Sequence, residues 1–231
     1  QYYAHLSEDN RKQTVEEHLH GTAQQSAHFA RSFDAEEHGM RVGLAHDIGK
    51  NTAAFQKRLA GGPKVDHSTA GAVLCAKRNE PITALCVAGH HSGLPDFGNA
   101  RTDTAGDASL IGRLKKYLSE GKTIQEDWEE ILPDSVPEPD FHQNGYYRSM
   151  WGRMLYSCLV DADFLDTESF MRGSPAPRSG YDSLPTLLDK LDRYIDQWGS
   201  PKNELNALRS SVLQDCIKAG KQKKGLFSLT V

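Results

Sequence analysis

The sequence predicts an all-α fold, a helical bundle followed by a short β-prone C-terminal tail. Apolar residues recur at helical spacing over most of the chain, and helix start and stop signals alternate along it. Only residues 226–231, with the sequence Leu-Phe-Ser-Leu-Thr-Val, are typical of a strand. With 231 residues, of which 38% are hydrophobic and 25% charged, the chain can bury a sizeable core.

The first predicted helix begins after a capping-box pattern. Thr14 and Glu17 form this pattern, and the apolar residues that follow recur at helical spacing, so a helix is predicted over residues 15–33. The next helix is expected to end at Gly49, a residue type that often follows a helix C-terminus. Along this half of the chain, further helices are predicted over residues 37–48, 52–59, 67–78, 81–89 and 108–118.

In the rest of the chain, segments rich in glycine and proline separate the predicted helices. Residues 92–106 are predicted to be a loop, and residues 121–143, which contain three prolines, are expected to be poorly structured. A long helix is predicted over residues 144–164, with an apolar stripe along one side. After a loop over residues 172–180, the last two helices are predicted over residues 184–198 and 202–219.

Composition narrows the class of protein. The four cysteines lie far apart without a C-x-x-C pair, so we expect reduced cysteines in a cytoplasmic protein. No apolar run reaches the roughly 18 residues that a membrane span needs, and no signal-peptide pattern opens the sequence, so we expect no membrane association. The net charge of -4 argues against a protein that holds duplex DNA by bulk electrostatics.

The adjacent pair His46-Asp47 suggests a metal site at the end of a helix. An imidazole binds transition metals, and a carboxylate has two oxygens, enough to bridge two ions. A histidine at a helix end can also be a solvated or capping group, so the pair alone leaves both interpretations open. Other candidate ligands also lie at predicted helix ends and on helix faces: His18, His67, His90, His91 and Asp163.

This spread of ligand types favours a site built between helices. Helical bundles assemble metal sites from side chains on several facing helices. A structural zinc site would use closely spaced cysteine and histidine pairs, and the sequence lacks that spacing. The pair His90-His91 is flanked by glycine and serine, which is hard to explain as part of a core.

Taken in order, these motifs resemble those of the HD superfamily. More narrowly, they resemble the HD nuclease domain of the CRISPR type I helicase-nuclease, from about residue 3 to residue 168. The segments that carry the resemblance are Glu17-His18-Leu19, Ala45-His46-Asp47-Ile48-Gly49-Lys50, Asp66-His67-Ser68-Thr69-Ala70-Gly71-Ala72, Gly89-His90-His91-Ser92-Gly93 and Asp161-Ala162-Asp163.

The resemblance implies two metal ions that share Asp47. The first would be held by His18, His46, Asp47 and Asp163, and the second by Asp47, His67, His90 and His91. Mixed histidine and carboxylate ligands suit divalent transition metals such as Mn, Fe, Co, Ni or Zn. Amphipathicity does not decide between Asp161 and Asp163, which point in different directions on a helix, and the resemblance favours Asp163 as the ligand.

The resemblance also suggests residues that contact the substrate. Lys50 could offer its ammonium group to a scissile phosphate, or it could be a solvated lysine near a helix C-terminus. Ser68 is a weaker candidate, because helix capping is the commoner use of such a serine. Ser92 opens the loop that adjoins His90-His91, and this loop is a further candidate for substrate contact. The remaining histidines are expected to be surface or partly buried residues, with His5 in a start typical of the family.

These expectations combine into one functional hypothesis. Residues 1–220 would form an HD nuclease domain that hydrolyses single-stranded DNA in CRISPR interference beside a helicase and the surveillance complex. Residues 221–231 would be a linker and the first strand of a missing helicase domain, in a chain cut from a larger protein. One alternative is an HD-type nucleotide phosphohydrolase, which would need a closed pocket with base and ribose contacts. The other is a recruitment module that does not cleave.

Overall fold

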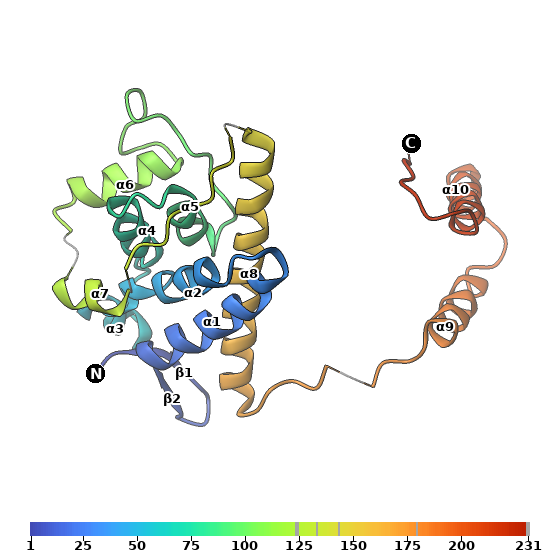
Figure 1. Ribbon diagram of the computed structural model, residues 1–231. Helices are drawn as coiled ribbons and strands as arrows, with labels where there is room; N and C mark the ends of the chain where they lie inside the picture. Colours follow the sequence, from blue (N-terminus) through green and yellow to red (C-terminus); the bar gives the residue numbers. More distant parts are fainter. Residues whose placement is uncertain (123–124, 133, 143, 179, 230–231) are drawn as a thin grey trace. The chain divides into compact units, whose positions relative to one another are not determined.

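The computed structural model describes residues 1–122, 125–132, 134–142, 144–178 and 180–229. It confirms the predicted all-α class, because the described residues form ten α-helices, two short 3₁₀ turns and a single pair of strands (Figure 1). The chain divides into two compact units, Gln1–Ala176 and Pro177–Val231. The elements of the first unit are β1 Tyr3–Leu6, β2 Lys12–Thr14, α1 Val15–Ala30, η1 Arg31–Phe33, α2 Glu36–Ala45, η2 Ile48–Lys50, α3 Ala53–Leu59, α4 Ser68–Lys77, α5 Pro81–Gly89, α6 Leu110–Ser119, α7 Glu126–Ile131 and α8 Gly145–Arg172.

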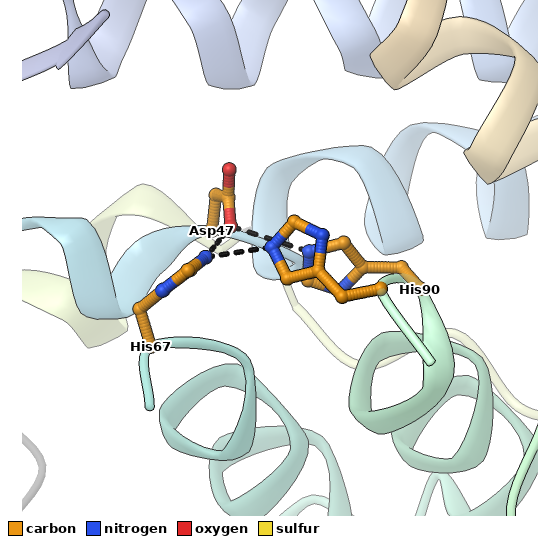
Figure 2. Close-up of side chains that lie close together, drawn as sticks. Asp47, His67 and His90 are labelled. Atoms are coloured by element: carbon orange, nitrogen blue, oxygen red, sulfur yellow. Dashed lines mark hydrogen bonds and ion pairs between the residues drawn. The ribbon is translucent and has the colours of Figure 1, made fainter. Parts of the chain in front are cut away.

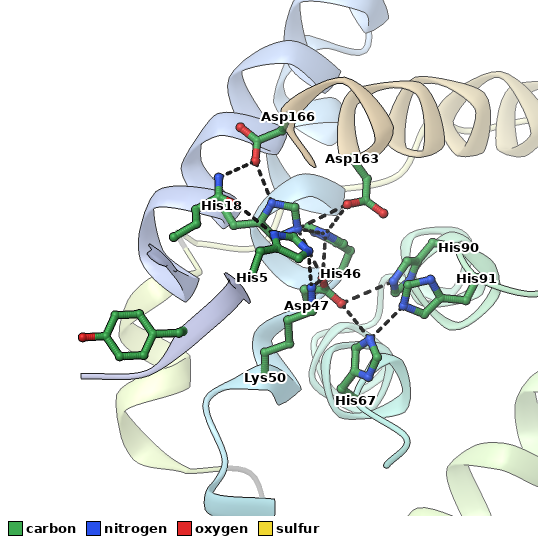
Figure 3. Close-up of polar contacts among 12 residues, drawn as sticks. His5, His18, His46, Asp47, Lys50, His67, His90, His91, Asp163 and Asp166 are labelled. Atoms are coloured by element: carbon green, nitrogen blue, oxygen red, sulfur yellow. Dashed lines mark hydrogen bonds and ion pairs between the residues drawn. The ribbon is translucent and has the colours of Figure 1, made fainter. Parts of the chain in front are cut away.

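A short β-hairpin precedes the first helix, and the sequence analysis did not predict it. β1 and β2 pair antiparallel, and His5 lies opposite Gln13. The guanidinium of Arg11, in the turn, donates hydrogen bonds to the carbonyls of Phe170 and Met171 near the end of α8. The hairpin is therefore held against α8, and the side chain of His5 lies among the clustered histidines and aspartates that Figure 3 shows.

Helix α1 packs against both α2 and α8. The predicted capping box forms, since the Thr14 hydroxyl accepts from Glu17 N and the Glu17 carboxylate accepts from Thr14 N. The buried face of α1 is mainly small, and α2 presents Gly43 to it, where a β-carbon would overlap the backbone of Ala23. Small residues on both helices let the two backbones approach closely. His18 on α1 is thereby brought beside the end of α2.

Helix α2 ends earlier than predicted. Its last residue is Ala45, and His46 and Asp47 follow it before the 3₁₀ turn η2, so the prediction of a helix up to residue 48 was wrong. The start of α4 lies against this exit, because Gly71 has no side chain and a β-carbon there would overlap the carbonyl oxygen of Ala45. The His46-Asp47 pair therefore faces the beginning of α4.

The segment over residues 121–143, expected to be poorly structured, contains a helix and buried anchors. Trp128 in the short helix α7 is only 1% exposed. Glu80, buried in an ion pair with Arg41, accepts a hydrogen bond from Val136 N at 3.2 Å. The Glu138 carboxylate accepts hydrogen bonds from the first backbone amides of α5. The prolines in this segment predict irregular structure. The contacts that order it could not be predicted from the local sequence, because the partners lie far away in the chain.

Helix α8 extends to Arg172, beyond the predicted end at residue 164. It stops at Gly173, which adopts a left-handed conformation with φ of 78°. Asp163 and Asp166 therefore lie within the helix rather than at its end, and their spacing of three residues places them on one face. This face is turned toward α1.

The second unit contains α9 Leu184–Asp196 and α10 Glu204–Gly220, and no residue of either helix is buried. Residues 225–229 form no strand in the described part of the chain, and residues 230 and 231 of the predicted strand lie outside it. The two units divide between Ala176 and Pro177, whereas the sequence predicted a domain boundary after residue 220. The role of residues 177–231 stays a prediction.

None of the described helices combines the length with the apolar character that crossing a lipid bilayer requires.

Candidate metal centre

Side chains from five separate parts of the first unit converge on one site (Figure 3). They come from α1, the exit of α2, the residue before α4, the exit of α5, and α8. They form two groups that could each hold a metal ion, with the potential ligand atoms of each group within 4.8 Å of one another. The first group is His18, His46, Asp47 and Asp163, and the second is Asp47, His67, His90 and His91.

Asp47 belongs to both groups and is fully buried. Its Oδ2 lies 3.3 Å from the Nε2 atoms of His18 and His46. Its Oδ1 lies 3.3 Å from the Nε2 atoms of His67 and His90, as Figure 2 shows for this side of the site. Each oxygen thus faces a different pair of imidazoles, which is the arrangement that a carboxylate bridging two ions requires.

Asp163, rather than Asp161, lies in the cluster. Its Oδ1 is 3.2 Å from Nε2 of His18 and 3.6 Å from Nε2 of His46. Asp161 is exposed on another side of α8. The position of Asp163 gives the first group a second carboxylate, whereas the second group has only the shared one.

Hydrogen bonds on the outer side of the imidazoles orient four of the five rings. The Nδ1 atom of His46 donates to Gly43 O at 2.7 Å, and that of His90 donates to Val87 O at 2.8 Å. In the same way, Nδ1 of His67 donates to Val65 O at 3.2 Å. With the proton on Nδ1, the Nε2 lone pair of each ring points into the site, as it does in histidines that bind metals.

The outer partner of His18 is Asp166, which the sequence analysis did not identify. Nδ1 of His18 donates to Asp166 Oδ2 at 2.7 Å. A carboxylate behind a metal-binding histidine increases the basicity of the ring and fixes its orientation. The sequence shows that Asp163 and Asp166 are three residues apart. It did not show that they share a helix face, because the helix was predicted to end at residue 164.

The contacts inside the site fit divalent metal ions. The Nε2 atoms of His67 and His91 lie 2.7 Å apart, and those of His18 and His46 lie 3.2 Å apart. Two lone pairs at such distances repel unless a proton or a cation lies between them. Both oxygens of Asp47 and Nε2 of His90 are buried without a hydrogen bond, although Oδ2 of Asp47 forms an ion pair with a lysine. Buried groups of this kind are expected to have partners, and metal ions would supply them.

The two groups differ in their electrostatics. Burial lowers the pKa of His18, but hydrogen bonds to Asp163, Asp166 and Asp47 outweigh it and raise the pKa to about 10. Burial likewise acts against the charge of Asp47, yet Lys50 and His46 hold its pKa well below the usual range. In the second group, burial and neighbouring positive charge lower the pKa of His91 to about 4. The first group therefore favours positive charge more strongly than the second.

Lys50 is buried beside Asp47, with only 5% of the residue exposed. Its Nζ lies 2.6 Å from Asp47 Oδ2 and 3.2 Å from Nε2 of His5, to which it can donate a hydrogen bond. The alternative of a solvated lysine was therefore wrong. The amine therefore lies at the edge of the first group, beside the carboxylate that the two groups share.

The N-terminal hairpin joins Lys50 to His18 through a circuit of hydrogen bonds. His5 Nδ1 donates to Gln13 Oε1 at 2.8 Å, and Gln13 Nε2 donates to Asp166 Oδ2 at 2.8 Å. Asp166 also accepts a hydrogen bond from His18, so a continuous chain of hydrogen bonds connects Lys50 to His18. Sequence reasoning assigned no role to His5 and overlooked Gln13, because the pairing of two short strands gave no detectable pattern.

The two serines proposed to contact substrate lie in different surroundings. The Ser68 hydroxyl donates to Asp66 at 3.2 Å and accepts from Arg113 at 3.0 Å, so it helps to fix the start of α4. Ser92 is exposed next to His91. Contact between either serine and a substrate stays a prediction.

The other histidines lie outside the cluster. His38 is buried, with its ring 4.9 Å from that of Trp151 and its Nε2 donating to Pro137 O. His20, His28 and His142 are exposed.

The family model of the HD domain matches residues 15–117. This range is somewhat less than half of the chain, and it includes every member of the two groups except Asp163. No curated protein matches the sequence. The match supports an HD domain in this part of the chain, and together with the cluster it indicates a metal-dependent hydrolase.

Proposed function

From the HD domain match and the paired ligand groups, we propose that the chain is a two-metal nuclease that hydrolyses phosphodiester bonds of single-stranded DNA. We further propose that it acts in CRISPR interference beside an ATP-driven helicase, which delivers the strand, and a surveillance complex. The observation that carries the proposal is the sharing of Asp47, with one oxygen directed at each group.

The geometry suits attack on a phosphodiester. Two divalent ions bound here would polarise the phosphate, activate water and stabilise the leaving oxygen. His18, His46, Asp47 and Asp163 would hold the first ion, and His67, His90 and His91 would complete the second with the other oxygen of Asp47. Lys50 would place its positive charge near the phosphate that undergoes cleavage, since its Nζ is beside Asp47.

The choice of substrate and partners depends on the resemblance of the ordered motifs to the HD nuclease domain of the CRISPR helicase-nuclease. The net charge of -4 is consistent with a domain that receives its strand from a partner rather than gripping duplex DNA by bulk charge. The described ligands are sufficient for two ions without an ATP-binding segment, so cleavage itself should not need ATP.

Cleavage of circular single-stranded DNA tests this proposal. The metal-free protein is supplied with Mn²⁺, Co²⁺ or Ni²⁺ without ATP, and we expect the circles to become linear and then shorter. A chelator should stop the reaction, and ion content should approach two per chain by metal analysis. Circles exclude exonuclease action on free ends, so linearisation shows an internal cut.

Three outcomes would contradict the proposal in different ways. Intact circles with every metal, from protein that is folded and loaded with two ions, would exclude the nuclease. Hydrolysis of mononucleotides without strand cleavage would favour a nucleotide phosphohydrolase. Binding of a surveillance complex with neither activity would favour the recruitment module.

A further inference from the structure

A cavity of about 570 Å³ adjoins the second ligand group. It lies between the N-terminal hairpin, α3 and the segment that leads into α4. Its walls combine site residues with side chains that play no part in holding a metal. Among the lining residues are Lys50, Phe55, Arg58, Lys64, His67 and His91.

The wall of this cavity is basic in a chain that is acidic overall. Lys50, Arg58 and Lys64 carry positive charge, and none of the lining residues is an aspartate or glutamate. The whole chain, in contrast, has 31 acidic against 27 basic residues. Arg58 and Lys64 are exposed, and no carboxylate pairs with either in the described part of the chain. The cavity therefore favours an anion.

The cavity leads directly to the candidate metal centre. His67 and His91 line it and belong to the second group, while Lys50 lines it and contacts Asp47 (Figure 3). Phe55 fixes this wall, since its ring packs edge-on against His67 at 5.0 Å and lies 5.5 Å from the Lys50 amine. An anion that reaches Arg58 or Lys64 could thus belong to the same molecule as a phosphate at the metals.

The polar groups of the wall suit a phosphate backbone better than a base or a ribose. Among the lining residues there is no asparagine, glutamine, serine or threonine, the neutral side chains that read base edges and sugar hydroxyls. Cationic side chains instead contact phosphates of any sequence. Arg58 is on α3 and Lys64 is in the segment after it, so the two charges come from different elements.

We propose that this cavity binds the phosphates next to the scissile one, with Arg58 and Lys64 each contacting a phosphate of a single strand. The inference rests on the proposed function and adds the path of the strand on one side of the metal centre. The cavity would bind single strands of any base sequence, because every contact would be made to the phosphates of the DNA backbone.

The test uses the double variant Arg58→Ala/Lys64→Ala and a control of equal charge, Lys57→Ala/Lys77→Ala. Lys57 and Lys77 are exposed and lie outside the cavity. Binding of a fluorescent oligothymidylate to the metal-free proteins is measured by anisotropy between about 50 and 200 mM salt. Each phosphate contact on a single strand contributes about 0.7 to the slope of log affinity against log salt, so the double variant should lose about 1.4.

Further measurements decide between this inference and its rivals. In the metal-loaded proteins, the cavity variant should raise KM for the oligonucleotide more than it lowers kcat, and the control should match the wild type. An equal salt slope for both double variants, or no oligonucleotide binding by the wild type, would overturn the inference. Displacement of the oligonucleotide by dTTP at equal affinity would do so too, because it would show a mononucleotide pocket.

The experiment separates failure of this inference from failure of the proposed function. A wild type that binds the strand with the expected slope and never cuts it would contradict the nuclease alone. A wild type that cuts circular DNA, with a cavity variant of unchanged slope and KM, would contradict the strand path alone.

Discussion

Asp47 is the residue on which both ligand groups depend, because its two oxygens face different pairs of imidazoles. The sequence could suggest this role from the His-Asp pair, since the two oxygens of a carboxylate can bind two neighbouring ions, whereas a neutral imidazole offers one lone pair. It could not show the burial of the carboxylate, which follows from the meeting of helices far apart in the chain. Burial also explains why Lys50 is drawn in beside it.

We predict that Asp47→Ala removes or loosens both metals, whereas His18→Ala and His67→Ala each affect mainly one. The reason is that each histidine belongs to a single group. Metal analysis after gel filtration gives the ion content of each variant. Equal ion content in all three variants would contradict a shared Asp47.

Asp166 contacts His18 and belongs to neither ligand group, so its loss should weaken metal binding without abolishing it. Replacement of such an outer partner typically lowers metal affinity about 10- to 100-fold. We therefore expect Asp166→Asn to weaken one of the two sites by that factor, measured by titration of metal-free protein with Co²⁺. Asp161→Asn, on the exposed side of the same helix, is the control and should bind both ions normally. Similar losses in the two variants would refute a special role for Asp166.

Helix positions were predicted well at the level of elements, and their ends less well. The capping box of α1 and Pro81 at the start of α5 are local signals, and each lies where a helix begins, whereas α8 runs on to Gly173, beyond its predicted end. The hairpin and α7 escaped prediction, because each is short and is held by distant partners such as the end of α8. The same limit applies to the circuit through His5 and Gln13, which depends on strand pairing.

The contact between α2 and α4 positions the two halves of the site, and Gly71 makes it possible. We predict that Gly71→Ala destabilises the protein by about 1–3 kcal/mol, because the added methyl group pushes α4 away from Ala45. The second metal should also bind more weakly, since His67 directly precedes α4. Thermal or chemical unfolding measures the first effect and metal titration the second. Gly145→Ala, where the added group meets open space, is the control, and an equal stability of the two variants would contradict this packing.

For the whole molecule, the first unit contains the buried core and every candidate ligand. We predict that a chain ending at Ala176 keeps its two metals, its activity and its melting temperature. The first unit has its own buried core and all the candidate ligands, so it should fold and bind metal without residues 177–231. A drop in melting temperature of many degrees would instead show that these helices stabilise the first unit.

The convergence of ligands from α1, the exits of α2 and α5, the start of α4, and α8 has a further consequence. Ions bound there would act as cross-links between segments that are up to about 145 residues apart, from His18 to Asp163. An unfolded chain cannot hold its ligands in this arrangement, so binding energy becomes folding energy. At a free metal concentration a hundredfold above Kd, each ion would add about 2.7 kcal/mol to the stability. The lifetime of this protein against proteolysis would then follow the supply of transition metal in its surroundings.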